Sequence, residues 1–231
     1  KNYFHKIFSI FKILFSIIKS IFILKKEKPD LIFGFGGYVS FPISFSSRLF
    51  ALPLVIYENN VLLGRANKIL SKFSKKILTA KEIMNFPEKM KSKTHYIGPI
   101  LNKNIINFSP SNKIFNKDFF SILVLGGSQG AEIFGKIIPP VIKMLEENGC
   151  KIFINQQCSK NQKDNIVDFY ERNGIKNNVF EFDDDVLKLI ASSNLAISRC
   201  GASATEELIY TQTPFIGVPL PNSIDNHQYL N

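Results

Sequence analysis

The sequence ISRCGASATEELIYTQTPFIGVPLPNSIDNHQYLN, residues 197–231, decides the fold of this chain. It starts at the end of an expected apolar strand, residues 194–197, and continues into an expected helix that carries Glu206 and Glu207. A second strand is expected over residues 214–218. A strand, a helix and a second strand in this order are typical of a parallel α/β sheet. Such sheets bind ligands at the edge where their strands end.

The polar groups of this stretch suit a nucleotide sugar. A carboxylate close to a loop-to-helix junction can accept hydrogen bonds from both hydroxyls of a ribose. The side-chain amide of Gln228, in the loop after the second strand, both donates and accepts, which suits the hydroxyls of a sugar. We therefore expect a ligand rich in hydroxyl groups at this edge.

The rest of the chain alternates strands and helices in two series, separated by a polar linker over residues 99–118. The other expected strands cover residues 30–33, 54–57, 76–79, 96–97, 120–125, 152–154 and 179–182. The expected helices cover residues 4–24, 42–51, 62–73, 131–147, 161–172 and 184–191. This pattern predicts an α/β protein with two Rossmann-like domains of doubly wound parallel sheets, residues 1–107 and 108–231, facing a cleft.

Charge is distributed unevenly along the 231 residues, of which 45% are hydrophobic, as in globular proteins. Residues 1–107 hold 18 Lys and Arg against 5 Asp and Glu, a net charge of +13, whereas residues 108–231 have a net charge of −3. A basic half favours an anionic partner: a membrane surface, a nucleic acid or a phosphorylated substrate. A lysine-rich genome would give the same excess without a partner, and no nucleic-acid-binding motif accompanies it.

The expected helix over residues 4–24 is apolar over most of its surface. At helical spacing, its polar residues fall on one narrow stripe: His5, Ser9, Lys12, Ser16, Lys19 and Ser20. The two lysines interrupt any uncharged run long enough to span a bilayer, and no signal-peptide cleavage site follows. The helix is therefore either a core element or one that lies at a membrane surface.

Two glycine-rich turns each connect an expected strand to an expected helix. They read FGFGGYVSFP, residues 33–42, and LVLGGSQGAE, residues 123–132. Glycines let the backbone approach a ligand closely, and free N–H groups at a helix start favour a phosphate. Neither turn has the spacing of a P-loop or of a nicotinamide-binding turn. Each turn alone could be a tight connection, but two in corresponding places favour phosphate binding.

Several other polar residues have two interpretations. Glu58, at the end of an expected strand, is a candidate base or substrate-orienting group, or a carboxylate that caps a helix. Asp183–Asp185 are typical of a helix cap with solvated charge. The cysteines Cys150, Cys158 and Cys200 lack CxxC spacing and the histidines are scattered, so we expect reduced thiols, no metal site and no cofactor.

Seven motifs together resemble the MurG family of bacterial N-acetylglucosaminyltransferases. They are FGFGGYVSFP, YENN, LGGSQGAE, FDDD, SRCGASATEEL, PFIGVPLP and DNHQYLN, in an order that covers nearly the whole chain. The resemblance implies the GT-B fold and the transfer of GlcNAc from UDP-GlcNAc to lipid I, which is undecaprenyl-diphosphate-MurNAc-pentapeptide. It also implies an inverting reaction without metal, at the cytoplasmic face of the bacterial plasma membrane. The partners implied are UDP-GlcNAc, lipid I and an anionic membrane surface, with no nucleic acid.

The resemblance also implies the site residues. Gly36, Gly37 and Tyr38 would bind the acceptor diphosphate, and Glu58 is the candidate catalytic residue. Within the donor site, Glu207 would bind the ribose and Gln228 the GlcNAc hydroxyls. The donor-binding residues implied are Asn60, Ser128, Gln129, Asp183, Ala202, Ser203, Ala204, Thr205, Glu206, Glu207 and Gln228.

The chain departs from the family pattern at two places. Tyr57 stands where the family has a histidine, and GPILN, residues 98–102, replaces a turn that contains an arginine, with Lys103 as the candidate substitute. We expect a fragment that lacks the first glycine loop and the last helices. A UDP-GlcNAc epimerase of the same fold is one alternative, and a membrane-peripheral binding module with a degenerate site is another.

Overall fold

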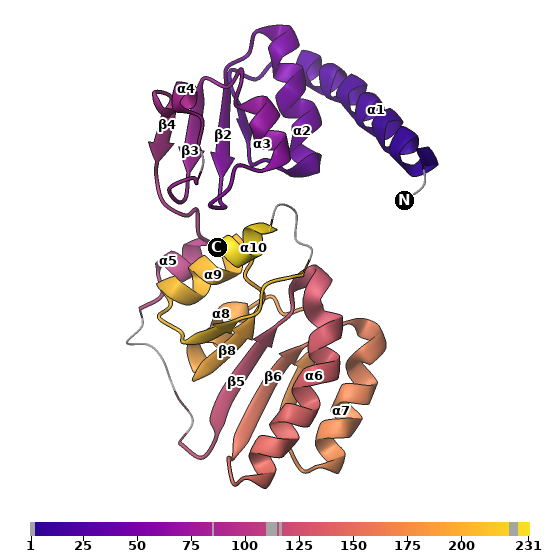
Figure 1. The fold of residues 1–231 in the computed structure, drawn as a ribbon, viewed down its shortest axis with the longest axis vertical. Helices are drawn as coiled ribbons and strands as arrows, with labels where there is room; N and C mark the ends of the chain where they lie inside the picture. The colour runs from indigo at the N-terminus through magenta and orange to yellow at the C-terminus, as the bar shows by residue number, and fades with distance from the viewer. Residues whose placement is uncertain (1–2, 85, 110–114, 116, 222–225) are drawn as a thin grey trace. The chain divides into compact units, whose positions relative to one another are not determined.

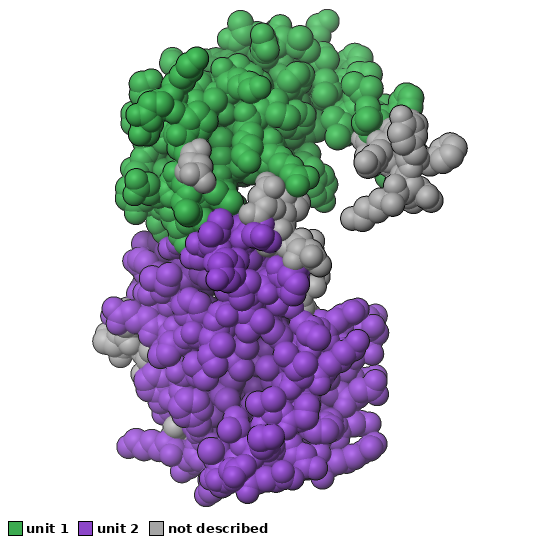
Figure 2. Space-filling model, viewed as in Figure 1, with its two compact units in different colours: residues 1–100 green, residues 101–231 purple. Residues whose placement is uncertain are grey.

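The computed structural model describes residues 3–84, 86–109, 115, 117–221 and 226–231, without the side chains of residues 3–7, 9 and 128–131. The chain divides into two compact units, Lys1–Ile100 and Leu101–Asn231 (Figure 2). Each unit contains a parallel sheet of its own (Figure 1).

The division lies after Ile100, whereas the sequence pattern predicted a boundary after residue 107. The expected linker contains a short helix, α5 (Lys103–Ile106), which packs on α9 (Ala202–Tyr210) of the second unit. The Tyr210 hydroxyl donates a hydrogen bond to the Ile106 carbonyl at 3.1 Å. These contacts attach α5 to the rest of the second unit.

The sheet of unit 1 has the order β1-β2-β3-β4, and all neighbouring strands are parallel. Its strands are β1 (Ile32–Gly34), β2 (Leu54–Glu58), β3 (Lys76–Thr79) and β4 (Thr94–Tyr96). Its helices are α1 (Tyr3–Glu27), α2 (Gly37–Ser46), the 3₁₀ helix η1 (Ser47–Phe50), α3 (Arg65–Leu70) and α4 (Glu88–Lys91). Apolar residues of α1, α3 and the strands form one buried core: Leu24, Ile32, Leu54, Ile56, Leu70 and Ile77.

The sheet of unit 2 has the order β7-β6-β5-β8-β9 and is also parallel throughout. Its strands are β5 (Phe120–Leu125), β6 (Ile152–Gln157), β7 (Lys176–Phe180), β8 (Leu195–Ser198) and β9 (Phe215–Gly217). Its other elements are α6 (Gly127–Glu147), η3 (Lys160–Gln162), α7 (Lys163–Arg172), α8 (Val186–Ser192) and α10 (His227–Leu230). Because β8 pairs with β5 and not with β7, the strand order reverses between β5 and β8, where such folds bind ligands.

Both faces of this second sheet are covered by helices. On one face, Phe134 of α6 and Tyr170 of α7 pack with strand residues such as Ile154. On the other face, Ile190 of α8 and Leu208 of α9 pack with a second set of strand residues. Unit 2 is therefore a doubly wound α/β sheet, as the sequence predicted (Figure 1).

Helix α1 leaves much of its apolar surface exposed. Figure 1 shows its N-terminal half standing clear of the sheet, while its C-terminal half packs on α2. Its exposed apolar residues are Phe8, Ile10, Phe11, Ile13, Leu14, Phe15, Ile18, Phe22 and Ile23. Lys12 and Lys19 lie over the rings of Phe8 and Phe15, each at 4.7 Å. No helix in the described part of the chain is long and apolar enough to cross a membrane.

Three elements start three or more residues earlier than the sequence predicted. Helix α2 begins at Gly37 rather than at residue 42, and α6 begins at Gly127 rather than at residue 131. Of the glycines that were interpreted as a turn, Gly37 already belongs to α2 and Gly127 to α6, while Gly36 and Gly126 are the N-cap residues. Strand β7 begins at Lys176 rather than at residue 179, because its asparagines pair with β6. There the Asn178 side chain donates to that of Asn155 at 3.1 Å.

Candidate functional site

The glycine loop of unit 1 connects β1 directly to α2. Gly36 and Gly37 have φ values of 75° and 72°, a left-handed conformation that favours glycine. The Ser40 hydroxyl donates to the Gly36 carbonyl and so closes the first turn of α2. Tyr38 follows the loop with 87% of its surface exposed. The loop therefore presents backbone N–H groups and an exposed phenol at the carboxyl end of the sheet.

Glu58 ends strand β2 and is 4% exposed. One carboxylate oxygen accepts hydrogen bonds from the backbone and side-chain N–H groups of Asn60, at 3.1 and 2.9 Å. The other accepts from the Gly64 backbone at 2.9 Å and from the Asn67 side chain at 3.0 Å. A carboxylate offers about four lone pairs, and here four N–H groups use them. This geometry makes Glu58 the anchor of the loop that carries Asn60.

Asn67, on α3, links this anchor to the glycine loop. It is 1% exposed, and its side-chain N–H₂ group donates to Glu58 and to the Tyr57 carbonyl. A Cβ atom at Gly36 would lie 2.8 Å from this nitrogen, so only glycine fits there. The Asn67 side-chain oxygen is buried and accepts no hydrogen bond from any described residue. The glycine loop and the Asn60 loop thus meet at one buried amide.

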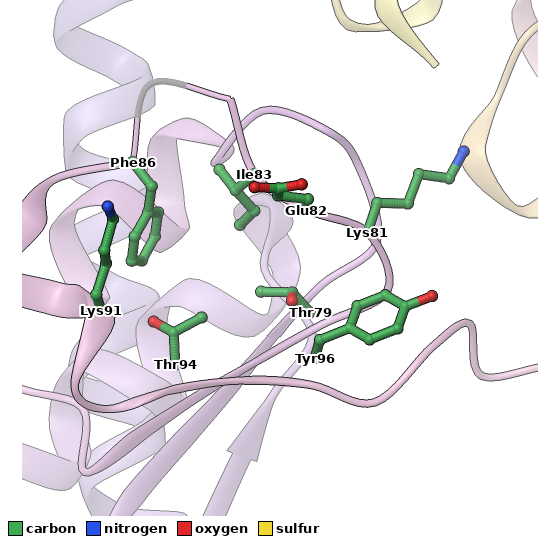
Figure 3. Close-up of a pocket in the computed structure, with 8 residues that line it drawn as sticks. All are labelled: Thr79, Lys81, Glu82, Ile83, Phe86, Lys91, Thr94 and Tyr96. Carbon is green, nitrogen blue, oxygen red and sulfur yellow. The ribbon is translucent and has the colours of Figure 1, made fainter.

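A cavity of about 660 Å³ opens beside β3 and β4 in unit 1 (Figure 3). Thr79 and Thr94 form its floor, with Phe86 on one side and Tyr96 on the other. Thr79 pairs in register with Glu58, so the cavity is one strand away from the Glu58 anchor. The residues that line it are not among those predicted from the sequence.

In unit 2 the glycine turn lies at the end of β5, next to the reversal of strand order. Gly127 has a φ of 62°, and its N–H donates to the Gln157 side chain at 3.1 Å. The Gln157 amide in turn donates to the Glu181 carbonyl at 3.3 Å. Gln157 was not predicted, yet it fixes the start of α6. The side chains of the predicted residues Ser128 and Gln129 lie outside the described part of the structure.

Arg199, at the end of β8, braces the loop that follows β9. Its guanidinium donates to the carbonyls of Val218 and Pro219 at 3.1 and 3.0 Å. The guanidinium also lies over the ring of Phe134, 4.7 Å from its centre, and is buried. No sequence motif indicates this role of Arg199, because its partners are backbone carbonyls.

The predicted donor residues of α9 divide into two groups. The side chains of Ala202 and Thr205 are buried, and the Thr205 hydroxyl donates to backbone carbonyls of the first turn. Ser203 is exposed, and Ala204, Glu206 and Glu207 are half-buried. Burial raises the pKa of the Glu207 carboxyl because it disfavours the charged form. Ala202 and Thr205 can therefore serve a ligand through their backbone, whereas Glu207 offers a side chain.

The remaining predicted donor residues lie in unit 2 and bond to nearby backbone. The Gln228 side-chain oxygen accepts from the Leu220 N–H at 2.8 Å and so holds the loop after β9. Asp183 accepts from the Asp185 N–H at 2.7 Å, and Asp185 pairs with Lys188 at 2.7 Å. This pairing lowers the pKa of Asp185. The acidic run thus forms a turn that leads into α8. Asp185 stands at the predicted cap position, but its side chain makes no capping hydrogen bond.

Lys103, the candidate substitute for the arginine of the family, is the first residue of α5. Asn102 caps α5 by accepting from the Asn104 N–H at 2.9 Å, and Lys103 is exposed beside it. Within the described residues, no group of three or more His, Cys, Asp or Glu is placed to hold a metal ion.

Comparison with protein families assigns both parts of the chain. Residues 1–79 match the glycosyltransferase family 28 N-terminal domain, and residues 121–231 match the glycosyltransferase family 28 C-terminal domain.

Two relatives share the name UDP-N-acetylglucosamine–N-acetylmuramyl-(pentapeptide) pyrophosphoryl-undecaprenol N-acetylglucosamine transferase. The protein from Pelagibacter ubique is 37% identical over 219 residues, which cover 94% of this chain and 61% of that protein. The protein from Rickettsia prowazekii is 35% identical, and the match covers 99% of this chain and 68% of that protein. The chain therefore spans about three fifths to two thirds of the length of these relatives.

A solved structure gives the same result. The crystal structure of Acinetobacter baumannii MurG is similar with a TM-score of 0.70 and 29% identity, covering 95% of this chain and 61% of that one.

Proposed function

The chain belongs to the MurG family of glycosyltransferase family 28, and from that premise we propose that it transfers GlcNAc from UDP-GlcNAc to lipid I. The acceptor atom in this proposal is the C4 hydroxyl of MurNAc, and the product is lipid II. The GT-B fold expected from the sequence is confirmed by the similarity to a MurG crystal structure.

The observation that carries the proposal is the pair of glycine loops at the carboxyl ends of the two sheets. One loop opens α2 and the other opens α6, and each helix start offers N–H groups to a diphosphate. Two diphosphates, one in the donor and one in the acceptor, are what the reaction requires. In this proposal Gly36, Gly37 and Tyr38 bind the acceptor, and the start of α6 stabilises the UDP that leaves.

The donor is assigned to unit 2, where Glu207 would accept from the ribose hydroxyls and Gln228 would hold the sugar. Asn60 contacts the transferred sugar from unit 1. Glu58 acts by positioning Asn60 rather than as the base, because its four hydrogen bonds leave no lone pair for the acceptor hydroxyl.

A membrane surface is the proposed location. The exposed apolar residues of α1, with Lys12 and Lys19 beside them, suit the interface of an anionic bilayer. The acceptor is anchored in that bilayer, so an enzyme that waits at the surface does not need to extract the lipid. We place the protein peripherally at the cytoplasmic face, where UDP-GlcNAc is available.

The experiment is a measurement of UDP release by the complete protein. UDP-GlcNAc is supplied with or without a short-chain lipid I analogue, and UDP-glucose serves as the donor control. Release that requires the analogue, and that is faster with UDP-GlcNAc, is the expected result. Conversion of UDP-GlcNAc without the acceptor would identify an epimerase, and binding without any release would identify a degenerate module.

A further inference from the structure

The hydroxyl of Tyr57 joins two separate segments of unit 1. Tyr57 lies on β2 directly before Glu58 and is buried. Its hydroxyl accepts the Ile100 N–H at 3.0 Å. The same hydroxyl has two acceptors for its own proton, the Asn59 side-chain oxygen at 3.1 Å and the Gly98 carbonyl at 3.3 Å.

The ring of Tyr57 contacts a third segment, the glycine loop. Phe35 lies between the loop glycines Gly34 and Gly36, and its ring meets that of Tyr57 edge-on at 5.8 Å. Phe33 meets Phe35 at 4.9 Å in the same manner. These contacts restrict the orientation of the phenol, and such aromatic pairs contribute beyond simple burial.

The segment held by the hydroxyl is the last part of unit 1. Gly98 has a φ of 81°, which turns the chain in a conformation that favours glycine. Residues 98–100 then end the unit, and the chain continues into unit 2 at Leu101. Because the Ile100 N–H is bonded to Tyr57, the exit of the chain from unit 1 is fixed to the end of β2.

We propose that Tyr57 is a positioning residue that fixes the chain exit, the Asn59–Asn60 turn and the glycine loop relative to one another. The functional part of this inference rests on the proposed function, in which Asn60 contacts the donor sugar. The structural part does not. A histidine, expected here from the resemblance, has a shorter side chain whose ring nitrogens cannot reach where the phenol oxygen lies.

The structural test is hydrogen exchange at the Ile100 amide of the complete protein. Tyr57→Phe removes only the hydroxyl, and Tyr57→His is a second variant. Tyr96→Phe is the control, because Tyr96 is exposed on β4, which β3 separates from β2. Exchange at Ile100 should accelerate about fivefold or more in both Tyr57 variants, the factor that one hydrogen bond provides, and stay unchanged in the control. Equal exchange in all four proteins would overturn the proposal.

The functional test separates positioning from general destabilisation. Tyr57→Phe should raise the KM for UDP-GlcNAc about fivefold through Asn60, whereas inhibition by UDP alone should not change, because UDP lacks the sugar. A purely structural role would change both the KM for UDP-GlcNAc and the inhibition by UDP, or neither of them. Either outcome overturns the positioning role. If the wild-type protein transfers no sugar at all, the proposed function fails while the exchange experiment still decides the role of Tyr57 at the chain exit.

Discussion

At the scale of single residues, Glu58 shows how the protein uses a buried charge. Four N–H groups from Asn60, Gly64 and Asn67 converge on its carboxylate. Removing one partner from a buried network leaves the others unsatisfied, which costs more than the net value of the bond. The residue therefore stabilises the loop that presents Asn60.

We predict that Glu58→Gln lowers the free energy of unfolding by about 2–3 kcal/mol, because the new NH₂ group faces two N–H donors. Urea unfolding measures this effect, with Glu82→Gln as the control on an exposed side chain of the same unit. Unchanged stability with complete loss of transfer would instead assign Glu58 to proton removal and would contradict its role as an anchor.

A second residue, Glu207, is predicted to bind the donor. Replacing it by Ala removes the acceptor for the ribose hydroxyls and should weaken UDP-GlcNAc binding by about 1–3 kcal/mol. Calorimetry on the complete protein measures the affinity, and Glu171→Ala, an exposed carboxylate on α7, is the control. The assignment of Glu207 is wrong if both variants bind like the wild type.

The raised pKa of Glu207 also leads us to predict that the stability of the folded protein depends on pH. Burial raises the pKa of Glu207 in the folded state, so the folded protein holds this proton more tightly than the unfolded chain. Its contribution to stability therefore falls as pH rises from the ordinary carboxyl range through the raised pKa. Without donor, Glu207→Gln should melt at a higher temperature than the wild type at pH 7. The difference should vanish below about pH 4. A lower melting temperature at pH 7 would contradict this account.

Among the elements, helix α1 differs in exposure along its length and around its axis. Ile17 and Ile21 are half-buried, and the Ile17 carbonyl accepts from the Ser46 hydroxyl of α2 at 3.4 Å. Ile18 and Phe22 are 52% and 69% exposed. One face thus packs on the unit, and the other is exposed.

We predict that Ile18→Ser and Phe22→Ser lower binding to anionic vesicles without lowering the melting temperature. Ile17→Ser and Ile21→Ser should lower the melting temperature, because these two side chains are half-buried. Vesicle sedimentation at low and high salt measures binding, which salt should weaken. If none of the four substitutions changes vesicle binding selectively, the membrane surface is not α1.

The sequence predicted most strands well and the starts of helices less well. Strand β3 was predicted with its observed bounds, because a short apolar run between lysine-rich segments has few other interpretations. The start of α2 was missed because Gly36 and Gly37 indicate a turn, and Pro42 indicates a helix start although it lies inside the helix. The roles of Gln157 and Arg199 were missed, since both bond to backbone atoms that only the fold brings near.

At the scale of the whole molecule, the proposed binding functions are distributed between the two units. Unit 1 carries the exposed apolar helix, the glycine loop that we propose for the acceptor and the Glu58 anchor. The basic half of the sequence lies mostly within it. Unit 2 carries the reversed strand order and the residues predicted for the nucleotide. This division explains why charge, exposed apolar surface and nucleotide motifs are separated along the chain.

The most direct test of the central claim is the structure of the product. The complete protein is incubated with UDP-GlcNAc and a short-chain lipid I analogue, and the glycosidic linkage is determined by NMR. We predict one new GlcNAc, β-linked to the C4 oxygen of MurNAc, because inverting transfer from an α-linked donor gives a β linkage. An α-linked product, attachment at another oxygen, or an altered sugar on UDP would contradict the account.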